Sequence, residues 1–485
     1  MANASRPGGA GVRELAPKKS RGKTLLKWGL VLVLLVLGAY WGWGKHAAAR
    51  LEREVARYRA AGEPIDPSDF LEPRPPDETN AAVDLIAAGK LIDERSKAWR
   101  RFTRLSPALP LDDKEIVVIG DLLNASSEAL QRLDAAMTKP RVYWRQTYQS
   151  PVVRSDPIPH YELGALVSVL RAAALRSHQR GDDRDALLRI RQILFIARAI
   201  DRDPSLASHG AAERAACDAC DAIVDIAPDL VADSQATTVD VRGLISDLTD
   251  DAADRAALVR ALQGERMRSC DFIRAYAAGH SELASPGYVV DFEARARRVF
   301  MAPLVLNDGP IVLAHISRLI DTARTASDWP EMRASLPDLD RPAEVTESPS
   351  LHCMTCLSMR RFESAIKGHF RTLATKRLAA SVLAIRLYAS EHGGRNPADL
   401  GQLVPSYLKT LPVDPMAQGG RRLHFVVGQV GAMLYSVGDN ETDELGDDWS
   451  VHVKPYPIPS GLDWCTPDFV AHLTRQPRIR FEDDE

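Results

Sequence analysis

The sequence lacks an excess of charge of either sign. Its 62 lysine and arginine residues stand against 65 aspartate and glutamate residues, which leaves a formal net charge of -3. Proteins that mainly bind nucleic acid carry a basic excess gathered into patches, so we do not expect nucleic acid as a partner. Aromatic residues make up only 6% of the chain, whereas Ala, Leu and Arg are abundant. Because these three residue types favour helices, we expect a mostly α-helical protein.

Familiar catalytic motifs are missing as well. The chain contains no G-x-S-x-G turn, no H-E-x-x-H zinc motif and no Walker phosphate loop. The twelve histidines are scattered, and those near the C-terminus show no ligand spacing. The sequence therefore favours a non-enzymatic protein. The alternative is an enzyme whose site is assembled from residues far apart in the chain.

Cysteine is sparse, and its arrangement leaves three interpretations open. Four of the six cysteines form two C-x-x-C pairs, Cys217/Cys220 and Cys353/Cys356, and the other two are Cys270 and Cys465. The long interval between the pairs does not match a zinc ribbon. Cys217 and Cys220 share a helical stripe with Ile223, which favours buried thiols. Disulfides are permitted in an exported protein, and metal or redox chemistry is the third possibility.

Long apolar runs are absent except for one, which extends from Leu25 to Trp43 and is interrupted only by Lys27. A helix of this length spans about 28 Å at about 1.5 Å per residue, close to the roughly 30 Å of a bilayer core. Aromatic residues stand at both ends, where membrane proteins carry aromatic belts: Trp28, Tyr40, Trp41 and Trp43. We predict a single transmembrane helix over residues 25–44 that tethers the rest of the chain to lipid.

Basic residues before this run set its expected orientation. Residues 1–24 carry six lysines and arginines and one acid, Glu14, whereas acids and bases mix after the run. The positive-inside rule then places residues 1–24 as a basic cytoplasmic tail and the bulk outside a bacterial cytoplasmic membrane. A cleaved signal peptide is the competing interpretation, because Ala47-Ala48-Ala49 offers an A-x-A site.

Proline and helical periodicity predict the remaining domains. Residues 45–79 are expected to form a helix and then a Pro-rich spacer, from Gly62 to Thr79, that lifts the body off the membrane. Residues 80–340 are expected to form a helical domain of stacked hairpins, with helices over 161–180, 187–200 and 211–226. Residues 341–360 are predicted to be a linker, 361–457 a small α+β module, and 458–485 a tail.

The module over 361–457 has the clearest pattern. A helix is expected over residues 361–390, ended by Gly393-Gly394, and a β-hairpin over 423–427 and 432–437. Residues 449–453 are the candidate third strand. The predicted fold class is therefore mostly α, with one N-terminal membrane helix and a small C-terminal α+β module.

The order of motifs in this module resembles the globular domain of major pseudopilins of type II secretion systems. The matching residues are Tyr388, Gly394, Pro397, Leu400, Leu403, Val404, Pro405, Tyr407, Leu408, Pro412, Asp414, Pro415, Tyr435, Ser436, Gly438 and Asp439. The membrane helix lies far upstream instead of running into this domain, so we do not expect the chain to polymerise as a pilin. The whole layout is similar to large single-pass envelope proteins of planctomycete-like bacteria, a resemblance that implies no activity.

The resemblance also implies a calcium site in the acidic loop over residues 439–448. Clustered carboxylates suit Ca²⁺, which takes six to eight oxygen ligands, although their spacing is not that of an EF-hand. By position the ligands would be Asp439, Asp443, Asp447 and Asp448. The alternative is a solvated acidic loop. As a function we expect an envelope scaffold with a protein partner, linked to a secretion-type machine.

Overall fold

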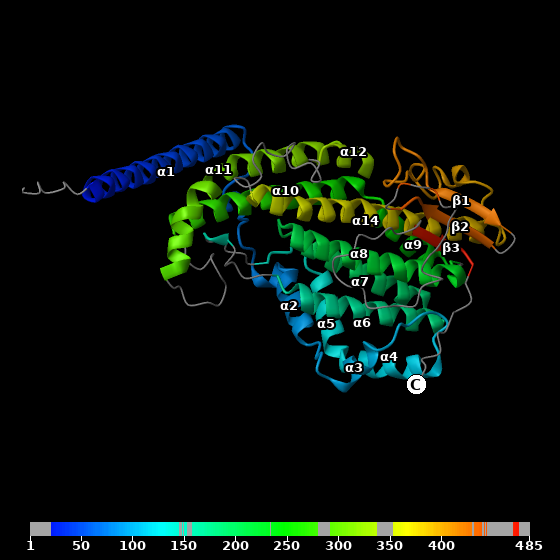
Figure 1. Cartoon of the computed structure of the whole chain (residues 1–485). Helices are drawn as coiled ribbons and strands as arrows, with labels where there is room; N and C mark the ends of the chain where they lie inside the picture. The colour runs from blue at the N-terminus through cyan, green and yellow to red at the C-terminus, as the bar shows by residue number, and fades with distance from the viewer. Residues whose placement is uncertain are drawn as a thin grey trace, which may run out of the picture.

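The protein is described by a computed structural model over residues 21–144, 148, 150–152, 158–232, 234–279, 292–336, 353–428, 431–438, 441, 443 and 469–474. Within these residues it is mostly helical, with a long apolar helix at the N-terminal end and a small antiparallel sheet near the C-terminal end (Figure 1). The expected mostly α class is thereby confirmed.

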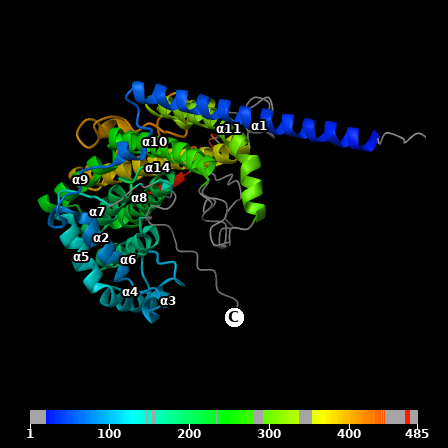
Figure 2. The same cartoon turned by 90° about the vertical axis from the view of Figure 1, so that its left-hand side faces the viewer.

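Helix α1 (Arg21–Ala60) is one uninterrupted helix, so the apolar run and the helix expected after it are continuous. Its apolar half is exposed, and it projects beyond the body in both views (Figures 1 and 2). Its second half is packed, because Leu51, Val55 and Tyr58 are buried against α10 (Asp251–Ala278) and α11 (Phe292–Ala323). The half that the body leaves uncovered is the half with the composition of a membrane anchor or signal helix.

The segment after α1 differs from the expected spacer because it lies against the body. It holds two short 3₁₀ turns, η1 (Pro67–Phe70) and η2 (Asp77–Thr79), and Ile65 is buried. Glu63 accepts hydrogen bonds from Arg266 on α10 at 2.8 Å and from Arg324 after α11 at 2.6 Å. Prolines prevent a regular helix here, but they leave an extended segment free to pack and pair.

A stack of helices follows, joined mostly by short connections. Its elements are α2 (Ala81–Lys90), α3 (Lys97–Phe102), α4 (Asp113–Ala125), α5 (Ser127–Met137), α6 (His160–Gln179), α7 (Asp183–Ile200), α8 (Leu206–Ile226), η4 (Ala227–Asp229) and α9 (Gln235–Leu248). The three helices predicted between residues 161 and 226 are confirmed as α6, α7 and α8. Gly181 adopts a left-handed conformation at the break between α6 and α7, with φ of 77°. Asp182 and Ser205 cap α7 and α8 through their side chains, as such residues do at helix starts.

A second group of helices covers this stack. It contains α10, α11, α12 (Trp329–Ala334) and α14 (Cys353–Glu391). Helix α14 begins at Cys353, so residues 353–360 are helical rather than part of a linker. It lies across α8 and α9 (Figure 1), and its Val382 and Ile385 share one buried cluster with Leu166 of α6 and Leu434 of the sheet. The helical body and the C-terminal module therefore have a common core.

Helix α11 is the second helix with the length and composition of a membrane span, over Phe300–Ala323. Its Leu313, Ile316 and Ile320 are buried in the body, whereas the corresponding window in α1 is not buried at all. In α11 39% of the window is buried, so this part of the helix packs in the body to an extent that the apolar part of α1 does not.

The sheet contains the predicted hairpin and one strand that was not expected. Strands β1 (His424–Gly428) and β2 (Gly431–Ser436) pair antiparallel, as predicted. The third strand, β3 (Phe469–His472), pairs with β2 and comes from the stretch expected to be a tail. Residues 449–453, the candidate third strand, lie outside the described residues. The short turn η7 (Leu400–Leu403) precedes the sheet.

Candidate metal centre

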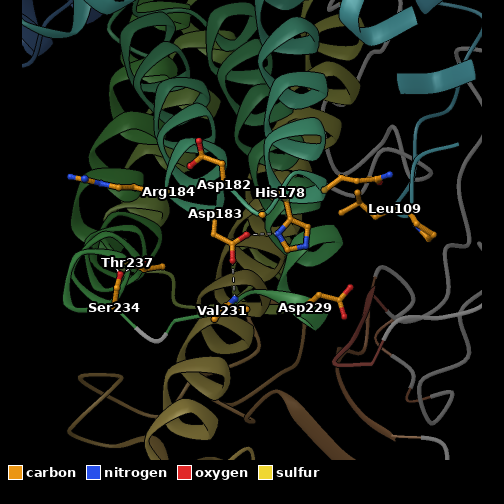
Figure 3. A pocket seen from close by; sticks show the side chains of 12 residues that line it. Leu109, His178, Asp182, Asp183, Arg184, Asp229, Val231, Ser234 and Thr237 are labelled. Carbon is orange, nitrogen blue, oxygen red and sulfur yellow. Dashed lines mark hydrogen bonds and ion pairs between the residues drawn. The ribbon is translucent and has the colours of Figure 1, made fainter. Parts of the chain in front are cut away.

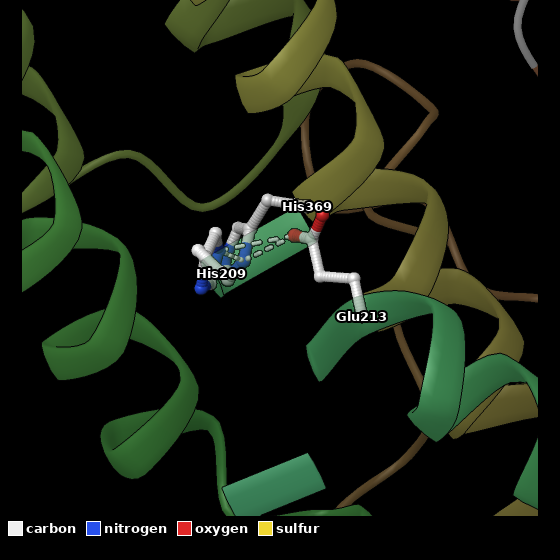
Figure 4. A group of neighbouring side chains, drawn as sticks. All are labelled: His209, Glu213 and His369. Atoms are coloured by element: carbon white, nitrogen blue, oxygen red, sulfur yellow. Dashed lines mark hydrogen bonds and ion pairs between the residues drawn. The ribbon is translucent and has the colours of Figure 1, made fainter. Parts of the chain in front are cut away.

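Two helices bring three metal-binding side chains together in the interior. His209 and Glu213 lie one turn apart on α8, and His369 points at them from α14 (Figure 4). Among the described residues this is the single group of three or more His, Cys, Asp or Glu side chains close enough to share an ion. Both histidines are buried, with 3% and 5% of their surface exposed.

Local sequence explains why α8 presents this pair. Pro204 follows the end of α7, and the Ser205 hydroxyl accepts the Ser208 N–H at 3.1 Å, so α8 starts just before His209. Residues four apart on a helix lie on the same face, which places Glu213 directly beyond His209. Helix α14 packs on that face of α8.

The spacing of the three ligand atoms fits a tetrahedral ion. His209 Nε2 lies 3.0 Å from Glu213 Oε1 and 3.2 Å from His369 Nδ1, and His369 Nδ1 lies 3.4 Å from Glu213 Oε1. Zinc–ligand bonds of about 2.0 to 2.1 Å at tetrahedral angles place ligand atoms about 3.3 Å apart. Glu213 Oε1 is buried and faces the nitrogen atoms of both histidines.

A fourth residue orients the first histidine. Asp201, at the C-terminal end of α7, accepts the Nδ1 proton of His209 at 2.7 Å. This hydrogen bond fixes the tautomer in which Nε2 offers its lone pair to the centre. Histidines that bind metals usually donate the other ring N–H to a carboxylate, a backbone carbonyl or water.

Electrostatics favour charge at this position. Burial by itself would raise the pKa of Glu213, but His209 and His369 hold that pKa at about 2. Burial would likewise lower the pKa of His209, yet the carboxylates of Glu213 and Asp201 raise it well above its ordinary value. The cluster thus stabilises a positive charge at His209 Nε2, which a proton or a metal ion can supply.

A pocket of about 340 Å³ borders the cluster and touches all three candidate ligands. Thr372 and Lys376 also line it, one and two turns beyond His369 on α14. Lys376 pairs with Asp254 on α10. A larger hollow of about 1040 Å³ lies against Glu213 and is lined by Cys217 and Arg371. The candidate centre is therefore buried but next to space for a small molecule.

Another pocket, of about 880 Å³, contains a histidine–aspartate pair with a different role (Figure 3). His178 Nδ1 lies 2.5 Å from Asp183 Oδ1, and the other oxygen of Asp183 accepts the Val231 N–H at 2.9 Å. These bonds fasten the turn between α6 and α7 to the loop before α9. The pair therefore holds two connections together.

The predicted calcium ligands are placed only in part. Asp443 is exposed, its Oδ1 accepts the Tyr435 hydroxyl proton at 3.1 Å, and its Oδ2 lies 3.7 Å from His424 Nδ1. Asp439, Asp447 and Asp448 lie outside the described residues. The calcium site stays a prediction.

Three cysteines are described as free thiols. Cys220 and Cys270 are buried, and Cys217 Sγ lies 3.6 Å from the Thr372 hydroxyl. The interpretation of the Cys217/Cys220 pair as buried thiols is confirmed for Cys220, whereas Cys217 is half-buried. The side chains of Cys353, Cys356 and Cys465 lie outside the described residues.

The sequence interpretation missed the candidate centre. The His209/Glu213 pair, four residues apart on an amphipathic helix, is the one local signal, and it is weak. Its third member lies 160 positions beyond His209. No protein-family model, curated protein or solved structure matches this chain. The resemblance to pseudopilins stays a prediction.

Proposed function

We propose that this chain is a membrane-anchored metalloprotein. Its helical body would hold one divalent transition metal on His209, Glu213 and His369, with an open coordination position for a ligand in the adjoining pocket. The observation that carries this proposal is the tetrahedral spacing of the three ligand atoms, at 3.0, 3.2 and 3.4 Å. Two imidazoles and one carboxylate suit zinc.

Three protein ligands, rather than four, support a role in chemistry. Structural zinc sites use four protein ligands, whereas catalytic ones leave a position for water or substrate. A bound zinc ion acts as a Lewis acid and activates water. Of the two functional expectations, this arrangement supports the enzyme assembled from sequence-distant residues over the scaffold. The expected protein partner and the link to secretion remain predictions.

The packing of α1 supports an uncleaved anchor. Ala47 is 1% exposed, and a Cβ on Gly44 would lie 3.2 Å from the Pro303 ring on α11. Cleavage after Ala49 would therefore cut α1 within a stretch that packs on the body. The proposed location is the bacterial cytoplasmic membrane, with the N-terminus in the cytoplasm.

Metal content tests the proposal directly. The full chain is purified in detergent, incubated with zinc, desalted and analysed by elemental mass spectrometry. We expect about one zinc ion per chain, as for a single binding site, and a loss of most of it in His209→Ala/His369→Ala. The matched control is His178→Ala, which removes another buried histidine with an aspartate partner and should keep the metal. A folded wild-type chain that retains no zinc, or a double variant that retains all of it, would refute the proposal.

A further inference from the structure

Helices α1 and α11 run side by side in the same direction. Tyr40 contacts Phe300, with ring centroids 6.4 Å apart, and the Tyr40 hydroxyl donates to the Phe300 carbonyl. Further along, a Cβ on Gly309 would lie 3.0 Å from Leu51. Phe300 therefore stands level with the aromatic residues that end the apolar run of α1.

Helix α11 changes direction near this level. Pro303 lies inside the helix, and an interior proline removes a hydrogen bond and kinks the helix. In both views the first turns of α11 leave the direction of α1 and run across it (Figures 1 and 2). If α1 crosses a membrane, these turns run along the membrane surface.

The sequence of these turns is amphipathic. Phe292, Ala296, Val299 and Phe300 follow the spacing of one helical face, and the charged residues Glu293, Arg295, Arg297 and Arg298 occupy other positions. The Phe300 side chain is 57% exposed despite its contact with Tyr40. An apolar face with arginines around it is the pattern of helices that lie at the boundary of headgroups and acyl chains.

We infer that the first turns of α11, residues 292–302, lie in the headgroup layer of the leaflet on the body's side and form a second membrane contact beside α1. The positive arginines attract anionic headgroups. The contact with the aromatic end of α1 places these turns at the depth of the headgroup layer. Two contacts in different directions would fix how the body faces the membrane. This inference depends on α1 as an anchor and not on the metal.

Photo-crosslinking of the full chain in nanodiscs containing phosphatidylglycerol tests it. Val299→p-benzoylphenylalanine places the probe on the predicted lipid face. The matched control is the same change at Val239, an exposed valine of α9. We expect lipid adducts, measured by intact mass, to be at least about fivefold more abundant at 299 than at 239, as for an apolar face immersed in the interface. Substitution at Arg298 should give few adducts.

Two outcomes would overturn the inference. One is lipid labelling at 299 no higher than at 239, with Val33→p-benzoylphenylalanine on the exposed apolar part of α1 labelling lipid normally. The other is a crosslink from 299 to a second polypeptide in place of lipid, which would make this surface a protein interface.

Discussion

Gly368 on α14 faces the carboxylate of Glu213 on α8, so that a Cβ at position 368 would lie 3.3 Å from Glu213 Oε2. Because a glycine stands there, the two helices can approach closely enough to hold Glu213 beside His369. Gly368 thus affects the geometry of the candidate centre although it offers no ligand atom itself.

Gly368→Ala should therefore weaken zinc binding. The added methyl group would shift the Glu213 carboxylate by a few tenths of an ångström, and disturbed support of a metal ligand typically costs 10- to 100-fold in affinity. We expect a loss of about tenfold, measured by competition with a chromophoric chelator. Gly210→Ala is the control, because a Cβ there meets only Arg214, at 3.9 Å. Equal affinities for the two variants would contradict the assigned role of Glu213.

A second glycine should matter for stability. A Cβ on Gly264 of α10 would lie 1.8 Å from the Pro204 carbonyl oxygen, in the turn that leads into α8. Gly264→Ala should lower the free energy of unfolding by about 3 kcal/mol, at the upper end of overpacking costs. Gly164→Ala, where nothing lies within 4 Å, should raise it by up to about 1 kcal/mol. Urea unfolding followed by circular dichroism measures both. A mild effect of Gly264→Ala would mean that α10 does not cross the turn this closely.

Acid should weaken the ion pairs at the C-terminal end of α1. The hydrogen bond from Arg59 lowers the pKa of Asp66. Burial would raise the pKa of Glu63, but Arg266 and Arg324 bring it below its ordinary value. A carboxyl group whose pKa is lowered in the folded state stabilises that state fully at pH values above its pKa in the unfolded chain, which is near 4. This stabilisation is lost as the pH falls through the pKa of the folded state.

The urea midpoint should accordingly fall as the pH drops below about 4.5, the region where unfolded carboxyl groups begin to take up protons. Glu63→Gln/Asp66→Asn should show a shallower fall over the same range. The control is Asp321→Asn, at an exposed carboxylate that also pairs with Arg324. Parallel acid curves for the double variant and the wild type would show that this network contributes no pH dependence.

Cys217 and Cys270 should react slowly with alkylating reagents in the native protein. Burial raises the pKa of Cys217 to about 12 and that of Cys270 to about 11. The thiolate is the reactive form, so iodoacetamide at pH 8 should label these two residues slowly before denaturation and fully after it. Peptide mass spectrometry reads each site. Rapid native labelling of Cys217 would contradict its raised pKa, and persistent blockage after denaturation would indicate a disulfide.

The periodicity of apolar residues predicted the elements that depend on short stretches of chain. The helices around residues 161–226 and the hairpin of β1 and β2 follow from local spacing and turn residues. Local patterns could not show that Glu63 pairs with Arg266, because that contact joins segments 203 positions apart. Strand β3 was missed for the same reason, since its pairing with β2 is decided by the sheet.

The candidate centre has the same limit. His209 and Glu213 are close in the chain, but only the packing of α14 on α8 brings His369 to them. The acidic loop is recognisable in the sequence because its charged residues are close together in the chain. The three candidate ligands come from two distant parts of the chain and are buried. Convergence of this kind depends on tertiary packing.

X-ray absorption at the zinc edge tests the central claim most directly, because it identifies the ligand atoms. For the purified full chain loaded with zinc, we predict a first shell of nitrogen and oxygen at about 2.0 to 2.1 Å, with outer-shell scattering from two imidazoles. His369→Ala should lose one imidazole contribution, and His178→Ala should leave the spectrum unchanged. Sulfur scattering at about 2.3 Å would assign the metal to cysteines instead, and would contradict a centre built from His209, Glu213 and His369.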